Sequence, residues 1–246
     1  MKQVLSRLRL GLLSCGMVST LAIGACSDRG SDDRGTPETA EARFRELELR
    51  LLDAETVRVK GGAGSTGTVT SALEGEALLA SGNRAHLQFT GEFGSASVAL
   101  ALVSDGQQVW GGNGTESFEI EAPTALNEAI LLGFTRMGIL HNLALLSGAS
   151  PPDGTDGSIR DWLTVTNFAW GEPETVDGVP TETLRFDVTV HGRPSAQAVL
   201  WLGRESGLPV QREQIVKFPD GEMRAVEVYQ TVETDAPFES GKFVVP

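Results

Sequence analysis

The stretch RAHLQFTGEFGSASVALALVSDGQQVW, residues 84–110, decides the fold that the sequence predicts. Apolar and polar residues alternate over 85–90, and this period of two is typical of a strand with one buried face. The apolar residues of 98–102 repeat the period with alanines between them. A Ser-Asp-Gly turn signal at 104–106 leads into a further short strand at 108–110. These residues predict antiparallel strands joined by tight turns.

The same alternation continues on both sides of this stretch. It begins at Val69, and beyond residue 110 it predicts strands at 117–121, 162–165, 184–190, 198–202, 210–218 and 224–232. Turn residues at 203–209 and 219–221 separate the last three of these strands. Short connections indicate an antiparallel meander, because parallel strands need long crossovers.

A helical period precedes the strands, over residues 38–60. Its apolar stripe comprises Phe44, Leu47, Leu51 and Leu52, and the charged residues assigned to the other faces are Glu46, Glu48 and Arg50. Thr36 followed by Pro37 fits an N-cap and a first-turn proline, and Gly61-Gly62 is expected to end the helix.

Residues 62–67, GAGSTG, match the glycine pattern of dinucleotide-binding sites. That pattern binds a pyrophosphate only where it follows a strand and opens a helix. Here the order is reversed, with a helix before the glycines and strand-like residues after them. We therefore interpret residues 62–67 as a flexible loop.

Residues 124–147 are strongly apolar and contain no turn signal of the β type. They predict one helix, or a broken pair of helices with a kink near Gly133 or Gly138. Charged and polar residues interrupt the segment too often for a bilayer span. A helix that is apolar nearly all round must be covered by protein or by a ligand.

The N-terminus has the pattern of a secretory signal peptide. Three basic residues precede an uncharged, mostly apolar stretch at 10–25, which is short for a membrane-spanning helix. Residues 23–26, Ile-Gly-Ala-Cys, resemble the lipobox of bacterial lipoproteins, in which the cysteine is acylated and becomes the first residue. Cys15 is a rival match, and an ordinary cleaved signal peptide is the alternative. We expect a signal peptide at 1–25, a lipid anchor such as palmitate on Cys26, and a flexible tether at 26–39.

Charge and cysteine content exclude several classes of protein. The chain has 20 Lys+Arg and 33 Asp+Glu, a formal charge of −13. Without residues 1–25 it has 17 basic and 33 acidic residues, a charge of −16. Such an acidic surface repels nucleic acid and adds no polybasic membrane contact. Two cysteines, Cys15 and Cys26, make neither a disulfide framework nor a thiolate zinc site.

The order of these parts resembles the LolA/LolB-like superfamily of lipoprotein-localisation factors, over residues 40–246. The order runs from a helix through a meander with the Ser-Asp-Gly turn and Val-Trp, then apolar helices, then a second meander. The second meander carries the short motifs Val176-Asp177-Gly178, Leu200-Trp201-Leu202, Ser206-Gly207-Leu208-Pro209-Val210 and Phe243 to Pro246. The resemblance implies an α+β fold: a curved antiparallel sheet, an unclosed barrel, covered by helices on its concave face.

The resemblance also implies an apolar hollow that holds acyl chains, with the central helix as a lid. Small residues at Ala99, Ala101, Gly133 and Gly138 are expected to leave space for such a ligand. The alternative is a closed core filled by the same side chains, the four tryptophans included. The residues expected to line the hollow are Leu87, Phe89, Leu100, Leu102, Trp110, Ile130, Phe134, Met137, Phe186 and Val188.

Two features depart from the family. The carrier LolA has an Arg-Pro pair at the end of an early strand, whose arginine helps to latch the lid. Residues 81–84 hold no such pair, and Arg84 is the candidate substitute. The soluble carrier is not lipidated, whereas this chain has a lipobox-like sequence, as the anchored acceptor and the actinobacterial lipid-binding lipoproteins do.

No constellation for catalysis or metal binding is present in the sequence. His86, His141 and His191 lie on different expected elements without metal-ligand spacing, and there is no nucleophile elbow. We expect no enzyme activity, cofactor, metal or nucleic-acid partner. The expected function is that of a monomeric, lipid-anchored envelope protein, at the outer membrane facing the periplasm, which binds acyl chains of lipid or lipoprotein. The alternative is an envelope sensor or scaffold that binds a protein partner.

Overall fold

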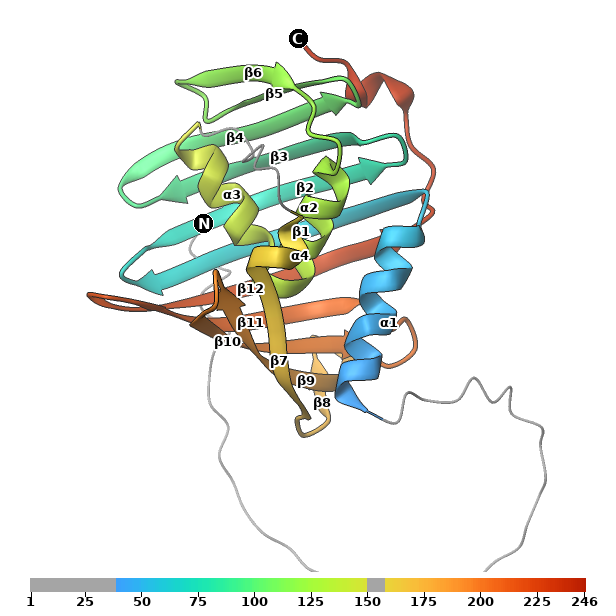
Figure 1. Ribbon diagram of the computed structural model, residues 1–246, viewed down its shortest axis with the longest axis vertical. Helices are drawn as coiled ribbons and strands as arrows, with labels where there is room; N and C mark the ends of the chain where they lie inside the picture. Colours follow the sequence, from blue (N-terminus) through green and yellow to red (C-terminus); the bar gives the residue numbers. More distant parts are fainter. Residues whose placement is uncertain (1–38, 150–157) are drawn as a thin grey trace, which may run out of the picture. The chain divides into compact units, whose positions relative to one another are not determined.

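Two antiparallel meanders form a single open sheet in the computed structural model, which describes residues 39–149 and 158–246 (Figure 1). The expected signal peptide, Cys26 and most of the expected tether lie outside the described residues. The first meander contains β1 (Thr56–Gly67), β2 (Ser71–Ala80), β3 (Arg84–Phe93), β4 (Ala96–Asp105), β5 (Gln108–Gly112) and β6 (Ser117–Glu121). The second contains β7 (Leu163–Trp170), β8 (Glu174–Val176), β9 (Val179–Val190), β10 (Arg193–Gly203), β11 (Pro209–Phe218) and β12 (Gly221–Thr234).

The two meanders join through their first and last strands. β1 pairs antiparallel with β12, from Val57 opposite Thr234 to Gly67 opposite Met223. The strand order is β6-β5-β4-β3-β2-β1-β12-β11-β10-β9-β7, with β8 paired to β9. The two ends of the order, β6 and β7, do not pair with each other, so the sheet is an unclosed barrel.

Four α-helices lie over one face of the sheet: α1 (Ala40–Asp53), α2 (Leu126–Met137), α3 (Ile139–Ser147) and the single turn α4 (Ile159–Trp162) (Figure 1). α3 contacts β1, β4, β5 and β12, while α1 contacts β7, β9 and α2. This arrangement confirms the predicted fold class, a curved antiparallel sheet with helices on its concave face.

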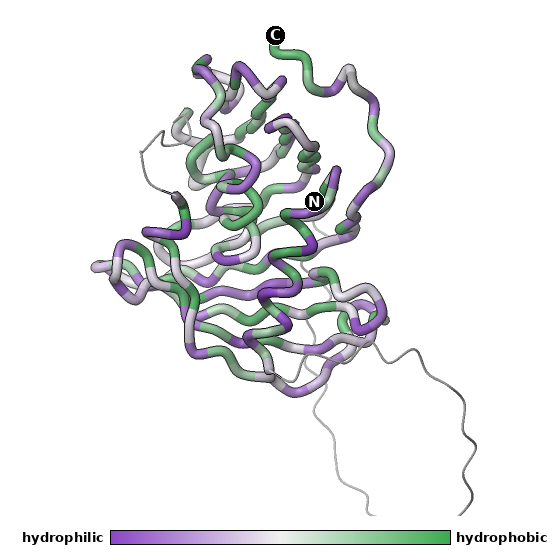
Figure 2. The backbone as a smooth tube through the Cα atoms, turned by 45° about the vertical axis from the view of Figure 1, so that its right-hand side comes forward, coloured by the Kyte–Doolittle hydropathy of each residue, from purple (hydrophilic) through white to green (hydrophobic). Residues whose placement is uncertain are grey.

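The core lies between the helices and the concave face. Apolar and polar residues alternate along the strands (Figure 2). The apolar side chains that face the helices form one buried cluster with the apolar stripe of α1. Phe44 of α1 is fully buried, and its ring centroid lies 4.8 Å from that of Phe186 on β9. Burial of this cluster is the main free-energy term that holds the helices on the sheet.

The first helix is shorter than the sequence predicts, and the interpretation of residues 62–67 as a loop is wrong. α1 begins after Thr39, whose side chain accepts a hydrogen bond from the N–H of Ala42, and it ends at Asp53. β-branched residues from Thr56 onward favour a strand, and β1 continues through the glycines. At Gly61 a Cβ atom would lie 2.2 Å from the carbonyl oxygen of Val228, so the close approach of β12 requires glycine there.

The central apolar segment is a broken pair of helices, with the break at Gly138. Gly138 has φ +86°, and α2 and α3 are bent by 117° across it. No single helix within residues 39–149 and 158–246 is long and apolar enough to cross a membrane. α2 and α3 reach that length and composition only as this bent pair.

The C-terminal segment covers part of the opposite face of the sheet. The 3-10 helix η2 (Ser240–Phe243) places Phe243 against Leu78 and Ala80 of β2. Lys242 forms an ion pair with Glu76 at 2.6 Å. The last residues of the chain are therefore attached to the convex face, away from the helices.

Candidate functional site

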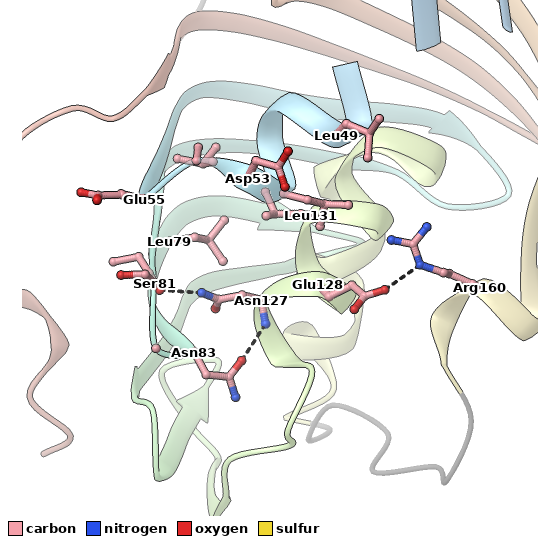
Figure 3. A pocket seen from close by; sticks show the side chains of 15 residues that line it. Leu49, Asp53, Glu55, Leu79, Ser81, Asn83, Asn127, Glu128, Leu131 and Arg160 are labelled. Carbon is pink, nitrogen blue, oxygen red and sulfur yellow. Dashed lines mark hydrogen bonds and ion pairs between the residues drawn. The ribbon is translucent and has the colours of Figure 1, made fainter. Parts of the chain in front are cut away.

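A cavity of about 580 Å³ opens between the C-terminal end of α1, the first turn of α2 and the adjoining ends of β1 and β2 (Figure 3). Its volume lies within the range of about 300–1,000 Å³ that small-molecule sites occupy. The apolar residues of its lining are Leu49, Leu52, Ala54, Val57, Leu79, Ala80 and Leu131. The remaining lining residues are polar, charged or glycine: Asp53, Glu55, Ser81, Gly82, Asn83, Asn127, Glu128 and Arg160.

The cavity owes its shape to two asparagines that fix the start of α2 to the turn between β2 and β3. Asn83 has φ +63°, a conformation that asparagine tolerates better than most residues. Its Nδ2 donates to the carbonyl oxygen of Pro123 at 2.5 Å, and its Oδ1 accepts from the N–H of Asn127 at 3.0 Å. Asn127 Nδ2 donates to the carbonyl oxygen of Ala80 at 2.7 Å, which leaves its buried Oδ1 without a hydrogen-bond donor.

Acidic residues outnumber basic residues in the lining of the cavity. Asp53, Glu55 and Glu128 are acidic, and Arg160 is the single basic residue among those that line the cavity. Arg160 Nε already donates to Glu128 Oε1 at 2.7 Å (Figure 3). Neither Asp53 nor Glu55 has an ion pair with any residue of the described chain. The mouth of the cavity therefore has a negative potential.

A second group of charges lies in the interior and fixes α2 to α1. Glu48 of α1 is 3% exposed and Arg136 of α2 is 4% exposed. Arg136 Nε donates to Glu48 Oε1 at 2.6 Å, and its Nη2 donates to Oε2 at 3.1 Å. This bidentate geometry is the strong form of an arginine–carboxylate contact. Arg136 Nη1 also donates to the carbonyl oxygen of Leu163 at 2.7 Å, which connects the pair to β7.

The sheet supplies a charge to each side of the break between α2 and α3. Arg212 of β11 and Glu227 of β12 stand opposite each other in the strand register, and each is 1% exposed. Arg212 donates to the carbonyl oxygens of Thr135 at 2.9 Å and Arg136 at 2.6 Å, at the C-terminal end of α2. Glu227 accepts from the backbone N–H groups of Ile139 at 3.0 Å and Leu140 at 2.9 Å, at the start of α3.

Both contacts suit the helix dipoles, because a cation is stabilised at a helix C-terminus and an anion at an N-terminus. Burial lowers the pKa of Arg212, while the neighbouring Tyr229 and Glu227 raise it. Burial and the charge of Glu227 raise the pKa of Tyr229 well above its ordinary value, so its hydroxyl donates to Glu227. The two carboxylate oxygens of Glu227 thus accept three hydrogen bonds in the interior.

The structure brings together most of the residues that the sequence assigns to the hollow. Nine of the ten belong to the buried cluster or pack against it: Leu87, Phe89, Leu100, Leu102, Ile130, Phe134, Met137, Phe186 and Val188. Trp110 does not join them. It alternates with the buried Val109 on β5, so its side chain lies on the opposite face of the sheet. None of the ten lines the cavity beside α1, and a ligand-binding role for them stays a prediction.

The space expected above the small residues of the central segment is occupied by protein. A Cβ atom on Gly133 would lie 2.9 Å from Asn142 Oδ1, and one on Gly138 would lie 2.3 Å from Glu227 Oε1. The tryptophans are also not uniformly interior, since Trp170 is 41% exposed. Side chains of α3 and the sheet, rather than empty volume, surround these two glycines.

The interpretation of Arg84 as a latch for the helices is wrong. Its guanidinium carbon lies 5.3 Å from the ring centroids of both Phe238 and Phe243, so Arg84 packs against the C-terminal segment. The arginines that hold the helices are Arg136 and Arg212. The assignment of Glu48 to a face of α1 other than the apolar stripe is also wrong. Glu48 is buried, and its spacing of four residues from Phe44 places it on that stripe.

The histidines do not come together as a metal site. Across residues 39–149 and 158–246, no three His, Cys, Asp or Glu side chains are placed to hold a metal ion. His141 of α3 and His191 instead flank Trp162, with ring centroids 6.4 Å and 5.4 Å from that of the indole. Burial lowers the pKa of His141, which favours its neutral form.

A comparison with solved structures finds several that are similar to this chain at low sequence identity. The lipoprotein LppX from Mycobacterium tuberculosis is 12% identical, with a TM-score of 0.42 over 80% of this chain and 98% of that one. A LolA superfamily protein from Nitrosomonas europaea is 10% identical, with a TM-score of 0.34 over 84% of this chain and 98% of that one. MucB, in the Pseudomonas aeruginosa MucA/MucB complex, is 14% identical with a TM-score of 0.41 over 84% of this chain, which spans 61% of the matched chain.

These similarities concern the fold. No family model matches the sequence, and no curated protein matches it. Identities of 10–14% with these three structures give no residue-by-residue correspondence for a site. A function must therefore be argued from the cavity and the charges of this chain.

Proposed function

We propose that this protein binds an acyl chain of a lipid or lipoprotein, without making or breaking a bond, as a lipid-anchored protein of the cell envelope. The observation that carries the proposal is the cavity of about 580 Å³ beside α1, with its apolar floor and polar mouth. A hydrocarbon chain gains about 25 cal/mol for each Å² that it removes from water, and a headgroup must stay hydrated or hydrogen-bonded. A cavity with leucines inside and charges at the mouth meets both requirements.

An exposed apolar side chain stands at the entrance. Leu49 lines the cavity and is 59% exposed. An acyl chain that enters between α1 and α2 would cover Leu49 and contact Leu131 and Leu79. The nine clustered core residues would come into contact with a longer chain only if α2 and α3 moved away from the sheet.

The anchor is part of the same proposal. Acylation of Cys26 after removal of residues 1–25 would hold the protein at a membrane, and Ser27 after the cysteine favours the outer membrane. The tether at 26–39 would let the acidic domain stand off the membrane surface. Labelling with radioactive palmitate in cells would detect the anchor, and the Cys26→Ala variant should lose the label.

Native mass spectrometry of the protein purified gently from its own membrane tests the cavity. We expect a population whose mass exceeds that of the anchored protein by one lipid, and a Leu131→Trp variant that fills the cavity should lose this population. Leu145→Trp, on α3 and 39% exposed, is the matched control and should keep it. Bare protein in both the unmodified chain and the control would overturn the proposal. A stable protein partner in crosslinked envelopes, with no lipid, would favour the sensor or scaffold alternative.

A further inference from the structure

The chemistry of the cavity mouth indicates which headgroup a bound acyl chain carries. We infer that the ligand is a cationic amphiphile, in which an ammonium group that donates hydrogen bonds is joined to the acyl chain. This inference rests on the proposed function, because it concerns the same cavity. It follows from the net charge of the lining residues and from the acceptors that they leave unused.

Three side-chain donors of the lining are already used in hydrogen bonds to the protein. Asn83 Nδ2 donates to Pro123, Asn127 Nδ2 donates to Ala80, and Arg160 Nε donates to Glu128. A phosphate or sulfate headgroup carries acceptors and negative charge, so it needs free donors or a free cation. Arg160 keeps N–H donors on its Nη atoms, but its charge is already balanced by Glu128, whose Oε1 lies 2.7 Å from its Nε.

Three acceptor groups of the lining are free. The carboxylates of Asp53 and Glu55 have no hydrogen-bond or ion-pair partner within the described chain, and Asn127 Oδ1 is buried without a donor. Figure 3 shows the Asp53 side chain directed into the space between α1 and α2, above Leu131. An ammonium group has three N–H donors, no acceptor and a positive charge, so it complements Asp53 and Asn127 Oδ1. The Glu55 side chain points away from Asn127 (Figure 3) and contributes only its negative charge.

The charge count gives the same result. The four ionisable residues of the lining sum to a formal charge of −2, from Asp53, Glu55, Glu128 and Arg160. Leu52, Leu79 and Leu131 add apolar surface to the same lining, and Leu79 and Leu131 are buried. The field at the mouth therefore attracts a cationic headgroup and repels an anionic one while the floor accepts the hydrocarbon.

Three probes with the same chain and different headgroups test the inference: decylamine, decanol and decyl phosphate, each titrated calorimetrically below its micelle-forming concentration near neutral pH. We expect decylamine to bind about tenfold more tightly than decyl phosphate, with decanol between them, since each exposed carboxylate contributes a modest factor. High salt should shrink the difference, because it screens exposed charges.

Two double variants test whether the preference for decylamine depends on the carboxylates at the cavity mouth. The double variant Asp53→Asn/Glu55→Gln should bring decylamine and decyl phosphate to within about threefold of each other and leave decanol binding unchanged. The control Glu92→Gln/Glu119→Gln removes the same charge at exposed sites on β3 and β6 and should keep the preference. A loss of preference in the control would mean that net charge, and not the cavity mouth, selects the probe, which would overturn the inference.

The outcomes separate this inference from the function on which it rests. If decanol does not bind, acyl binding itself fails. If decanol binds and decylamine has no advantage over decyl phosphate, only the headgroup inference fails. A reversed preference that disappears in Arg160→Gln would show that Arg160 leaves Glu128 for an anion, which also overturns it.

Discussion

Glu227 illustrates how much a single buried residue determines here. It lies opposite Arg212 in the strand register, receives the hydroxyl of Tyr229, and accepts the first two N–H groups of α3. A buried carboxylate is tolerated only where such partners replace water. Arg212 is similarly enclosed, with its guanidinium carbon 5.4 Å from the ring centroid of Phe186.

Replacement of Glu227 by glutamine should destabilise the protein by about 3 kcal/mol, because Arg212 would keep its charge in the interior without its counterion. The free energy of unfolding in urea, from paired transitions of the variant and the unmodified protein, measures the loss. Glu213→Gln on β11 is the matched control. Glu213 pairs with Arg224 at 2.7 Å on the surface, and its removal should cost less than about 1 kcal/mol. Equal losses in the two variants would contradict this account of Glu227.

His141 should make the stability depend on pH. Burial lowers its folded-state pKa below the ordinary value of about 6.5, so the unfolded chain takes up the proton first. Its contribution is fully present above the unfolded-state value and is lost as the pH falls through the lowered folded-state value. We expect His141→Gln to flatten the fall in the urea midpoint between about pH 7.5 and pH 5. Ala144→Gln, at an exposed position of the same helix, should leave that fall unchanged.

For single residues, the sequence predicts which apolar side chains are buried better than it predicts which residues the buried charges contact. The nine clustered apolar residues are recognisable from periodicity, because their burial is a local pattern. Glu48, Arg136, Arg212 and Glu227 are not, because a buried charge and a surface charge look alike in a sequence. Their partners lie between 15 and 88 positions away along the chain, so no local pattern joins them.

Among the elements, the break between α2 and α3 is the most constrained. Gly138 has a positive φ, and the carboxylate of Glu227 occupies the place where a Cβ atom would stand. The 117° bend turns α3 across the sheet, and this direction places its leucines over the concave face. The break therefore determines which surface the second helix buries.

A Gly138→Ala variant should be destabilised by more than the backbone strain alone, by about 3 kcal/mol, because the new methyl group would displace Glu227 from the N–H groups of α3. Gly178→Ala provides the comparison. Gly178 has nearly the same φ, +85°, but nothing lies within 4 Å of its Cβ position, so that variant reports strain only, about 1 kcal/mol. Thermal unfolding of both variants measures the difference. An equal loss of stability would show that Glu227 moves aside without cost.

Sequence periodicity predicts the positions of some helices and strands but not all of their boundaries. The strands at 85–89 and 117–121 and the position of the second break candidate, Gly138, follow from local pattern and turn chemistry. The end of α1 does not, because Leu51, Leu52 and Val57 satisfy a helical spacing as well as a strand that starts at Thr56. Pairing with β12 decides in favour of the strand. Thr234, the partner of Val57, lies 177 positions away along the chain, so it leaves no local signal.

For the molecule as a whole, net charge opposes folding. The chain has 33 acidic and 20 basic residues, so the folded surface carries an excess of negative charge that repels itself. We expect the urea midpoint to rise when NaCl is increased from about 10 mM to about 150 mM, because salt screens surface repulsion more than it weakens the buried pairs. KCl should act in the same way. A midpoint that falls with both salts would indicate that surface ion pairs outweigh the repulsion.

The architecture was more predictable than the place of the cavity. Two meanders and an apolar central segment indicate an open sheet with helices on one face. The location of the cavity depends on how α1 and α2 diverge from each other above β1 and β2. That divergence is set by the Glu48–Arg136 pair and by the two asparagines at the start of α2, which are contacts between distant parts of the chain.

The open sheet has two edge strands, β6 and β7, whereas a closed barrel has none. An edge strand can pair with a strand of another molecule. β6 pairs with β5 on one side, and its other backbone edge is a potential template for a strand of a second molecule. Glu119 and Glu121 are exposed and lie two residues apart on β6. Two copies that approached edge to edge would therefore bring like charges together. The acidity that opposes folding thus also discourages association of two copies at the β6 edge, one of the two edges of the sheet.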